Sequence, residues 1–446
     1  MSGRIDFTMD FKQPGAAQVR RQEPAYRFYI LGGFSGANDT PWVQRNIRAV
    51  DSDCFDHVLA DLAPVLRFDT HLQLRFESLE DFHPDAWLDK VKLIADLRVL
   101  KQQLSNPVTA EQAAGKIQAF FPSAPAVVAS KEAEEGQDEM LERLLGKKPE
   151  KIQDEPDTVE RLLKQVVAPF VSRNADPQYR HWLEVIDAAI GQILRAILHD
   201  PGFQSLESLW RATRTLLNEE LADRHGFYLL DISPAELMAE QNSGGSELAR
   251  KLLQHIQKGD GEQEVVLIGS FGFSASAEDR ELLCRCAGLA QQCGARLLAD
   301  ADQGFIQQAL AADAEGRAHV GSPSLLLAYP RYLLRLPYGQ KRDPIEAFEF
   351  EECAAIPRQE ELLWGCASML LARGLIRTSQ PYSPEALFFE DIPVFSYQLE
   401  GESVLQPGTE AVLNEGQANE LLALGIAPLI GYRQRRGVRL WGLAGF

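Results

Sequence analysis

The sequence lacks a long hydrophobic run, and this absence argues against a membrane-spanning helix. Its longest apolar stretch, residues 362–376, covers about 15 positions and is interrupted by Gly365 and Arg373, whereas a helix needs about 20 apolar residues to cross a bilayer. The N-terminus also lacks an apolar run before a small-residue cleavage site, so we expect no secretory signal. We therefore expect a cytoplasmic protein that does not insert into membranes.

Cysteine is scarce, with six in 446 residues, and the cysteines lie mostly inside apolar segments. Small secreted domains carry denser cysteine frameworks, so this usage favours reduced thiols over disulfides. The six are Cys54, Cys284, Cys286, Cys293, Cys353 and Cys366.

An excess of positive charge is also missing. The formal net charge is −19, which argues against nucleic acid and anionic lipid as bulk partners because phosphate binding needs a concentrated basic face. One basic cluster stands out near the end of the chain, and it consists of Arg433, Arg435, Arg436 and Arg439. The sequence leaves two interpretations of this cluster open: a solvated strand edge that deters unwanted pairing, or an electrostatic contact with an acidic neighbouring subunit.

The sequence shows no motif whose residue types and spacing match a known catalytic or metal-binding site. Gly146-Lys147-Lys148 lacks the earlier glycine and the hydroxyl residue of a phosphate loop, and the eight histidines show no HExxH or other ligand-like spacing. Glu207 and the Glu351-Glu352 pair could act as paired carboxylates, but nothing in the sequence places them together, which favours a solvated or salt-bridged role. We expect no catalytic residues, no metal site, no cofactor and no enzymatic activity.

Residues 1–130 are predicted to form a small α/β domain. Residues 26–31 (YRFYIL) are rich in aromatic and β-branched types and run into a glycine pair, which is typical of a strand followed by a tight turn. Apolar residues recur at helical spacing in residues 41–49 and again from Phe55 to residue 62, which predicts helices there. Residues 71–76 alternate between apolar and polar types, as in a half-buried strand, and a further helix is predicted to begin near Pro84.

Residues 131–157 form an acidic, helix-prone stretch that is predicted to link two separate folding units. The second unit is divided into residues 158–320 and 321–446. Helices are predicted at residues 162–171, 182–197 and 203–217, and strands at 227–232 and 264–268 enclose a helical segment, which suggests a parallel βαβ unit. The predicted fold class is α/β (α+β), multidomain, with mixed sheets flanked by helices.

Three stretches of the first unit carry a family resemblance: RFYILGGFSG, then RNIRAVDSDCFDHVLADLAPVL, then LQLRFESLEDFHPD. In this order they resemble the small sheath subunit of type VI secretion systems (TssB/VipA-like). That family opens with a strand ending in a Gly-Asp-Phe-Ser-Gly turn; here Gly33 replaces the aspartate, whereas Phe34, Ser35 and Gly36 are kept.

The second unit resembles the large sheath subunit of the same systems (TssC/VipB-like). The resemblance rests on ILHDPGFQSLESLWRATRTL, LIGSFGFSASAEDRELL, YPRYLLRLPYG and LLWGCASML, and the matching positions include Trp210, Arg211, Arg335 and Tyr338. The ending, PGTEAVLNEGQANELLALGIAPLIGYRQRRGVRLWG, resembles the terminal domain of that family, a helix followed by a last pair of strands. Residues 269–271 again lack the usual aspartate and are expected to form a turn.

The resemblance implies a structural component of a type VI secretion apparatus in which two sheath subunits are fused in one contractile-sheath or sheath-like protomer. Such protomers assemble by adding strands to neighbouring subunits, and the candidate strands are residues 6–11, 427–432 and 438–441. The alternative is a non-contractile, sheath-derived adaptor or cap at the baseplate or distal end. The assembly residues that we expect are Phe34, Ser35, Gly36, Trp210, Arg211, Arg335, Tyr338, Tyr432, Arg433, Arg435, Arg436, Arg439 and Trp441.

The implied partners are other copies of the chain, in a ring or helical tube, together with inner-tube hexamers, baseplate proteins and separate sheath subunits. A hexameric disassembly ATPase is a further implied partner, and a helix containing Leu141, Leu144 and Leu145 is the segment that it would recognise.

Overall fold

A computed structural model describes residues 26–68, 72–106, 109, 112–113, 116, 179–240, 246–258, 263–311, 324–378 and 387–443. The predicted strand at residues 6–11, the acidic linker at 131–157 and the helix at 162–171 lie outside these residues.

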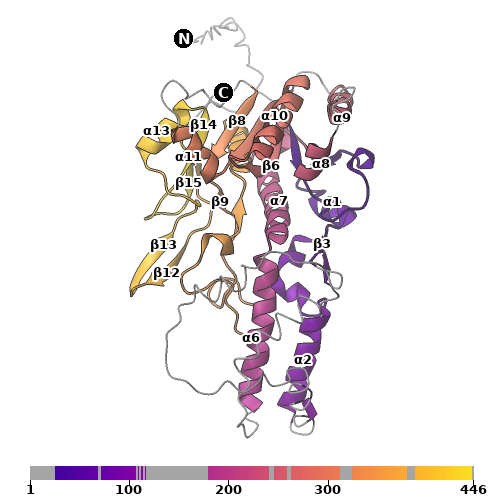
Figure 1. Ribbon diagram of the computed structural model, residues 1–446, viewed down its shortest axis with the longest axis vertical. Helices are drawn as coiled ribbons and strands as arrows, with labels where there is room; N and C mark the ends of the chain where they lie inside the picture. The colour runs from indigo at the N-terminus through magenta and orange to yellow at the C-terminus, as the bar shows by residue number, and fades with distance from the viewer. Residues whose placement is uncertain are drawn as a thin grey trace, which may run out of the picture.

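The described residues are organised around one nine-stranded sheet (Figure 1). In spatial order its strands are β11 (Phe388–Phe389), β15 (Val438–Leu440), β14 (Ile426–Gly431), β8 (Leu325–Tyr329), β7 (Arg296–Ala301), β6 (Glu264–Phe273), β1 (Tyr26–Gly32), β5 (Gly226–Asp231) and β2 (Arg48–Val50). The six from β14 to β5 run parallel, whereas β2, β15 and β11 are antiparallel to their neighbours. The predicted α/β class with a mixed sheet is therefore confirmed.

β1 lies inside this sheet, between β5 and β6. It pairs in parallel with both of them over its length, and all seven of its residues are buried. The predicted parallel arrangement of β5 and β6 is observed, but β1 separates the two strands. The two parts of the chain that were expected to fold separately thus share one sheet, because an open position between β5 and β6 accepts a strand from far earlier in the chain.

Helices cover both faces of the sheet, and alternate side chains of β1 enter the two cores. Phe28 and Ile30 pack in a core with residues of α7 (Pro201–Leu217) and α12 (Ala367–Arg377). Tyr29 and Leu31 pack in the opposite core. Residues of this second core come from α8 (Pro234–Ala239), α9 (Glu247–Ile256), α10 (Ala277–Gln292), α11 (Gln303–Ala311) and α13 (Glu415–Ala423). Because both faces are covered, the burial of β1 is continuous, as is typical of a central strand in a parallel sheet.

Two long helices extend away from the sheet. α6 (Tyr179–Leu198) and α2 (Lys92–Ser105) lie side by side at the lower end of the molecule in Figure 1. α6 ends where Asp200 caps the N-terminus of α7 by accepting a hydrogen bond from the backbone of Phe203 at 2.9 Å. The two helices predicted at residues 182–197 and 203–217 are confirmed as α6 and α7.

The first part differs from the sequence prediction in its loops. The helix predicted for residues 41–49 is wrong, because Trp42–Gln44 form only a 3₁₀ turn and β2 follows. The helix α1 (Phe55–Leu62) is confirmed, and β4 (Gln73–Arg75), which pairs with β3 (Val65–Arg67), confirms the predicted strand. α2 begins at Lys92, later than predicted.

Two further elements differ from expectation in the second part. Residues 269–271 do not form a turn; they lie within β6, where the register with β7 shifts between Ile268 and Gly272. The strands β14 and β15, predicted to pair with a neighbouring subunit, pair inside the chain with β8 and β11. They are therefore not free to add to another sheet in this fold.

Smaller two-stranded units complete the description. β9 (Tyr332–Leu333) pairs with β10 (Trp364–Gly365), and β12 (Phe395–Leu399) forms a hairpin with β13 (Glu402–Gln406) that projects from the body (Figure 1).

Asp300 ties β7 to α12. Its carboxylate accepts hydrogen bonds from the backbone N–H groups of Ala367 (2.6 Å) and Ser368 (2.7 Å) at the start of α12. The side chain is buried, and burial raises the pKa of Asp300 to about 6. The folded protein therefore favours the protonated form of this group more than the unfolded chain does.

Cutting the chain tests the shared sheet. We expect residues 1–136 and 137–446, expressed separately, to fail to fold, because the second fragment lacks the strand between β5 and β6. Co-expressed, the fragments should copurify and unfold in one transition by circular dichroism. A cooperative unfolding transition in either fragment alone would contradict the shared sheet.

The pH dependence of stability tests Asp300. The stabilising contribution of its protonated form is present below pH 4 and is lost as the pH rises through about 6. Relative to Asp300→Asn, the wild-type free energy of unfolding should fall by about 3 kcal/mol across this window of about two pKa units, because one unit corresponds to about 1.4 kcal/mol. Urea unfolding of both proteins at several pH values measures this difference, and a pH-independent difference would refute the assignment.

Candidate functional site

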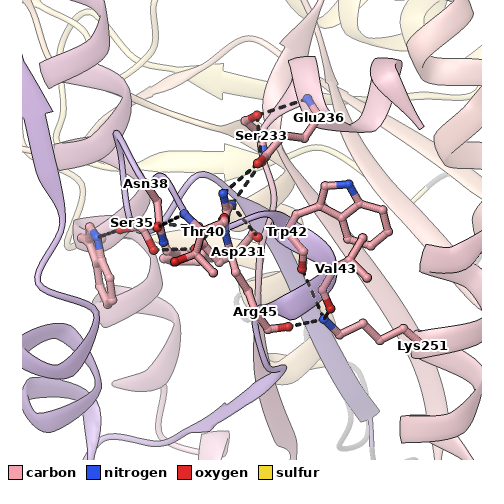
Figure 2. Close-up of polar contacts among 12 residues, drawn as sticks. Ser35, Asn38, Thr40, Trp42, Val43, Arg45, Asp231, Ser233, Glu236 and Lys251 are labelled. Carbon is pink, nitrogen blue, oxygen red and sulfur yellow. Dashed lines mark hydrogen bonds and ion pairs between the residues drawn. The ribbon is translucent and has the colours of Figure 1, made fainter. Parts of the chain in front are cut away.

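The turn after β1 is held by the end of β5 (Figure 2). Ser35 donates hydrogen bonds from its backbone N–H (3.1 Å) and its hydroxyl (2.5 Å) to the two carboxylate oxygens of Asp231. Gly36 has φ +62°, and a Cβ there would lie 2.3 Å from the carbonyl oxygen of Val65, so the position requires glycine. The kept Ser35 and Gly36 thus fix the path of the chain as it leaves the sheet.

Arg45 and Lys251 extend this polar contact between the two parts of the chain (Figure 2). The Arg45 guanidinium binds both carboxylate oxygens of Glu236 at 2.7 and 3.1 Å and lies 3.6 Å from Asp231. The Lys251 ammonium donates to the carbonyl oxygens of Trp42 (3.3 Å), Val43 (3.1 Å) and Arg45. Burial lowers the pKa of Lys251 below its ordinary value. We call this set the β1 exit contacts: Ser35, Arg45, Asp231, Glu236 and Lys251.

Phe34 and Trp210 form an apolar contact between the turn after β1 and α7, in the core that also contains Phe28 and Ile30. Their rings meet edge to face at 5.1 Å between centroids, and the Trp210 indole donates a hydrogen bond to the carbonyl oxygen of Phe34 at 3.1 Å. Phe55 packs on the same tryptophan at 5.6 Å. All three side chains are fully buried, so Trp210 joins α7 to two segments of the first part.

Arg335 is the centre of a buried ionic network. It contacts Glu207 of α7 through Nε at 2.8 Å and binds the two oxygens of Glu352 at 2.7 and 3.0 Å. Its guanidinium also stacks on the Tyr338 ring at 4.1 Å, while Arg211 contacts Glu207 at 2.7 Å. Burial alone would raise the pKa of Glu207, but Arg335 and Arg211 hold it below its ordinary value.

The sequence predicted a solvated or salt-bridged role for Glu207 and Glu352 but did not place the two side chains together. The salt-bridged role is confirmed, and both carboxylates are buried against one arginine. The available signal was Arg335 itself, a cation between Leu334 and Leu336, which needs partners if it is buried. Arg211, Arg335 and Tyr338 were also expected at contacts between subunits; in the described residues they link α7 to the segment after β9.

The basic cluster divides into exposed and packed arginines. Arg433, Arg435 and Arg436 are exposed in the turn between β14 and β15. Arg435 stacks on Phe388 at 4.1 Å and on Tyr432 at 4.5 Å. Arg439 lies 5.1 Å from the Trp441 ring, whose indole donates to Asn419 at 2.9 Å. Of the expected assembly residues, the three arginines of the turn and Gly36 are exposed.

A cavity of about 930 Å³ opens at the carboxyl ends of β1, β6 and β7, where open α/β sheets commonly bind ligands. Its walls include Gly33, Ser270, Asp302 and the ion pair between Arg331 and Glu410.

In the ranges that the structure describes, no three His, Cys, Asp or Glu side chains are grouped so as to hold a metal ion. No described helix is long and apolar enough to cross a membrane. Leu141, Leu144 and Leu145 lie outside the described residues.

Two family models match the chain. The model described as "EvpB/VC_A0108, tail sheath N-terminal domain" matches residues 180–321 and 317–441. The chain belongs to this tail sheath family. A second model, described as "Type VI secretion system, VipA, VC_A0107 or Hcp2", matches residues 2–120, so sheath-type matches lie on both sides of the acidic stretch. The resemblance of the two parts to the small and large type VI sheath subunits, fused in one chain, is confirmed.

A curated relative agrees with the family. The "Type VI secretion system sheath protein TssC1" of Pseudomonas aeruginosa is 24% identical over 297 residues, which cover 58% of this chain and 60% of the relative. The match to the tail sheath family ends at residue 441 and is to its N-terminal domain. The helix and last pair of strands that were expected at the ending of the chain are observed as α13, β14 and β15.

Substitution of Arg335 tests the ionic network. Arg335→Leu leaves Glu207 and Glu352 buried without a cation, which should lower the free energy of unfolding by about 3 to 5 kcal/mol. Arg250→Leu is the matched control, because Arg250 is 64% and its partner Glu247 39% exposed, and such an exposed pair should contribute less than about 1 kcal/mol. Urea unfolding measures both, and equal losses would show that the buried network has no special role.

Proposed function

We propose that this protein is a structural subunit of a type VI secretion apparatus, in which the small and large sheath-type parts form one self-assembling protomer in the cytoplasm. The observation that carries the proposal is the position of β1. A strand within the VipA-type match lies between two strands within the tail sheath match and pairs with both. The two parts therefore act as one rigid unit of assembly.

The contacts around β1 support a permanent association of the two parts. The β1 exit contacts lie on one side of the turn and the Phe34–Trp210 pair on the other, and both join residues before and after the acidic stretch. Fusion in one chain supplies the two parts in equal numbers. It also keeps them at high effective concentration during folding, since linked segments meet intramolecularly.

The proposed partners are further copies of the chain, in a ring or helical tube. We include inner-tube hexamers, baseplate proteins, separate sheath subunits and a disassembly ATPase as proposed partners of the assembled form. Residues 427–441 take no part in strand exchange in this proposal, because β14 and β15 are paired within the chain. Both family matches are to sheath proteins, which supports the sheath role over the non-contractile adaptor.

Electron microscopy tests the proposed self-assembly. The purified chain should form closed rings or helical tubes in negative stain, and the fraction of assembled protein should rise with protein concentration. Ile30→Asp serves as the control: it places a charge in the buried centre of β1 and should abolish folding and assembly together. A folded wild-type protein that stays monomeric at every concentration would contradict the proposal.

A further inference from the structure

The turn between β14 and β15 presents three arginines that no carboxylate of the described residues neutralises. Arg433, Arg435 and Arg436 are exposed, and no carboxylate in the described part of the chain lies within ion-pair distance of them. The turn is nevertheless well fixed. Arg435 is stacked on Phe388 and Tyr432, and a Cβ at Gly437 would lie 2.6 Å from the Phe388 ring, so the backbone packs closely on β11. A rigid, unpaired basic surface in a chain of net charge −19 points to an acidic partner.

An acidic surface lies beside the opposite edge strand of the sheet. β2 leads into the N-terminus of α1, and this segment carries the exposed residues Asp51, Asp53, Asp56 and Asp61. Asp61 pairs with Arg48 at 3.3 Å, and Asp51 accepts the backbone N–H of Cys54 at 2.7 Å. Asp53 and Asp56 have no ion pair to the described residues. Two carboxylates on this surface therefore remain free to meet a cation from outside.

The two surfaces lie at opposite ends of one rigid sheet. β11 and β15 form one end of the strand order and β2 forms the other. In Figure 1, β15 and α1 lie on opposite sides of the molecule. Both edge strands are short, with two residues in β11 and three in β2, so they offer little backbone for strand addition. Side-chain charge is what these edges present to a neighbour.

We propose that successive copies of this chain associate edge to edge, with the arginine turn of one copy against the Asp53 and Asp56 surface of the next. This inference rests on the proposed self-assembly and names its contact. The two surfaces differ, so the contact is heterologous and repeats from copy to copy, which generates a ring or a helical array. The occupant of each surface is a second copy, because the same chain carries both complementary charges.

The contact should depend on ionic strength. Exposed charges are screened over about 8 to 10 Å at near-physiological salt and over about 3 Å at 1 M. Association measured by sedimentation velocity should therefore weaken as salt is raised, because the contact depends on charge. Salt-independent association of the wild-type protein would overturn the inference.

Complementary charge reversal tests the pairing itself. Arg433→Glu with Arg436→Glu makes both surfaces acidic, and Asp53→Arg with Asp56→Arg makes both basic. Neither pair of substitutions touches the stacked Arg435. Each doubly substituted protein alone should associate about tenfold or more weakly than wild type, since close charge pairs give coupling of that size or larger. An equimolar mixture of the two should recover association, because every contact in an alternating array again joins opposite charges.

The controls separate this inference from the proposed function. Arg280→Glu reverses an exposed arginine of α10 and should leave association unchanged, and circular dichroism checks that every variant is folded. Wild-type-like association of both doubly substituted proteins, or a mixture that fails to recover, would overturn the edge contact while leaving self-assembly intact. A folded wild-type protein with no association at low salt would overturn both.

Discussion

The structure depends on β1 filling the position between β5 and β6. Hydrogen bonds on both sides of this strand and burial of its two faces make it the link between the VipA-type part and the tail sheath part. Removing it would expose two strand edges and open both cores at once. The two sheath-type parts therefore complete each other and form one cooperative folding unit.

The polar and ionic contacts have complementary roles around this strand. The β1 exit contacts hold the chain where it leaves the sheet, whereas the Arg335 network fixes the start of the segment after β9 against α7. Buried ion pairs add less to stability than their number suggests, because desolvation offsets much of the attraction. Their directional contacts also define how the segment after β9 lies against α7.

Local elements were predictable from the sequence, and long-range pairing was not. A short apolar run indicated β5 correctly, and helical spacing indicated α6 and α7, because local patterns of apolar residues report burial directly. The helix predicted at residues 41–49 failed because Lys251, about 200 positions later, binds the carbonyl oxygens of that loop. The place of β1 and the pairing of Glu207 with Glu352 across Arg335 likewise depend on residues that are distant in sequence, so no local pattern encoded them.

Amide hydrogen exchange of the intact chain tests the central claim most directly. If β1 is a central strand, the backbone amides of residues 28–31 should exchange as slowly as those of β6, because they open only with global unfolding. Mass spectrometry of peptic fragments would resolve the three strands concerned. Fast exchange in β1 alongside slow exchange in β5 and β6 would contradict the account, since it would place β1 outside the sheet.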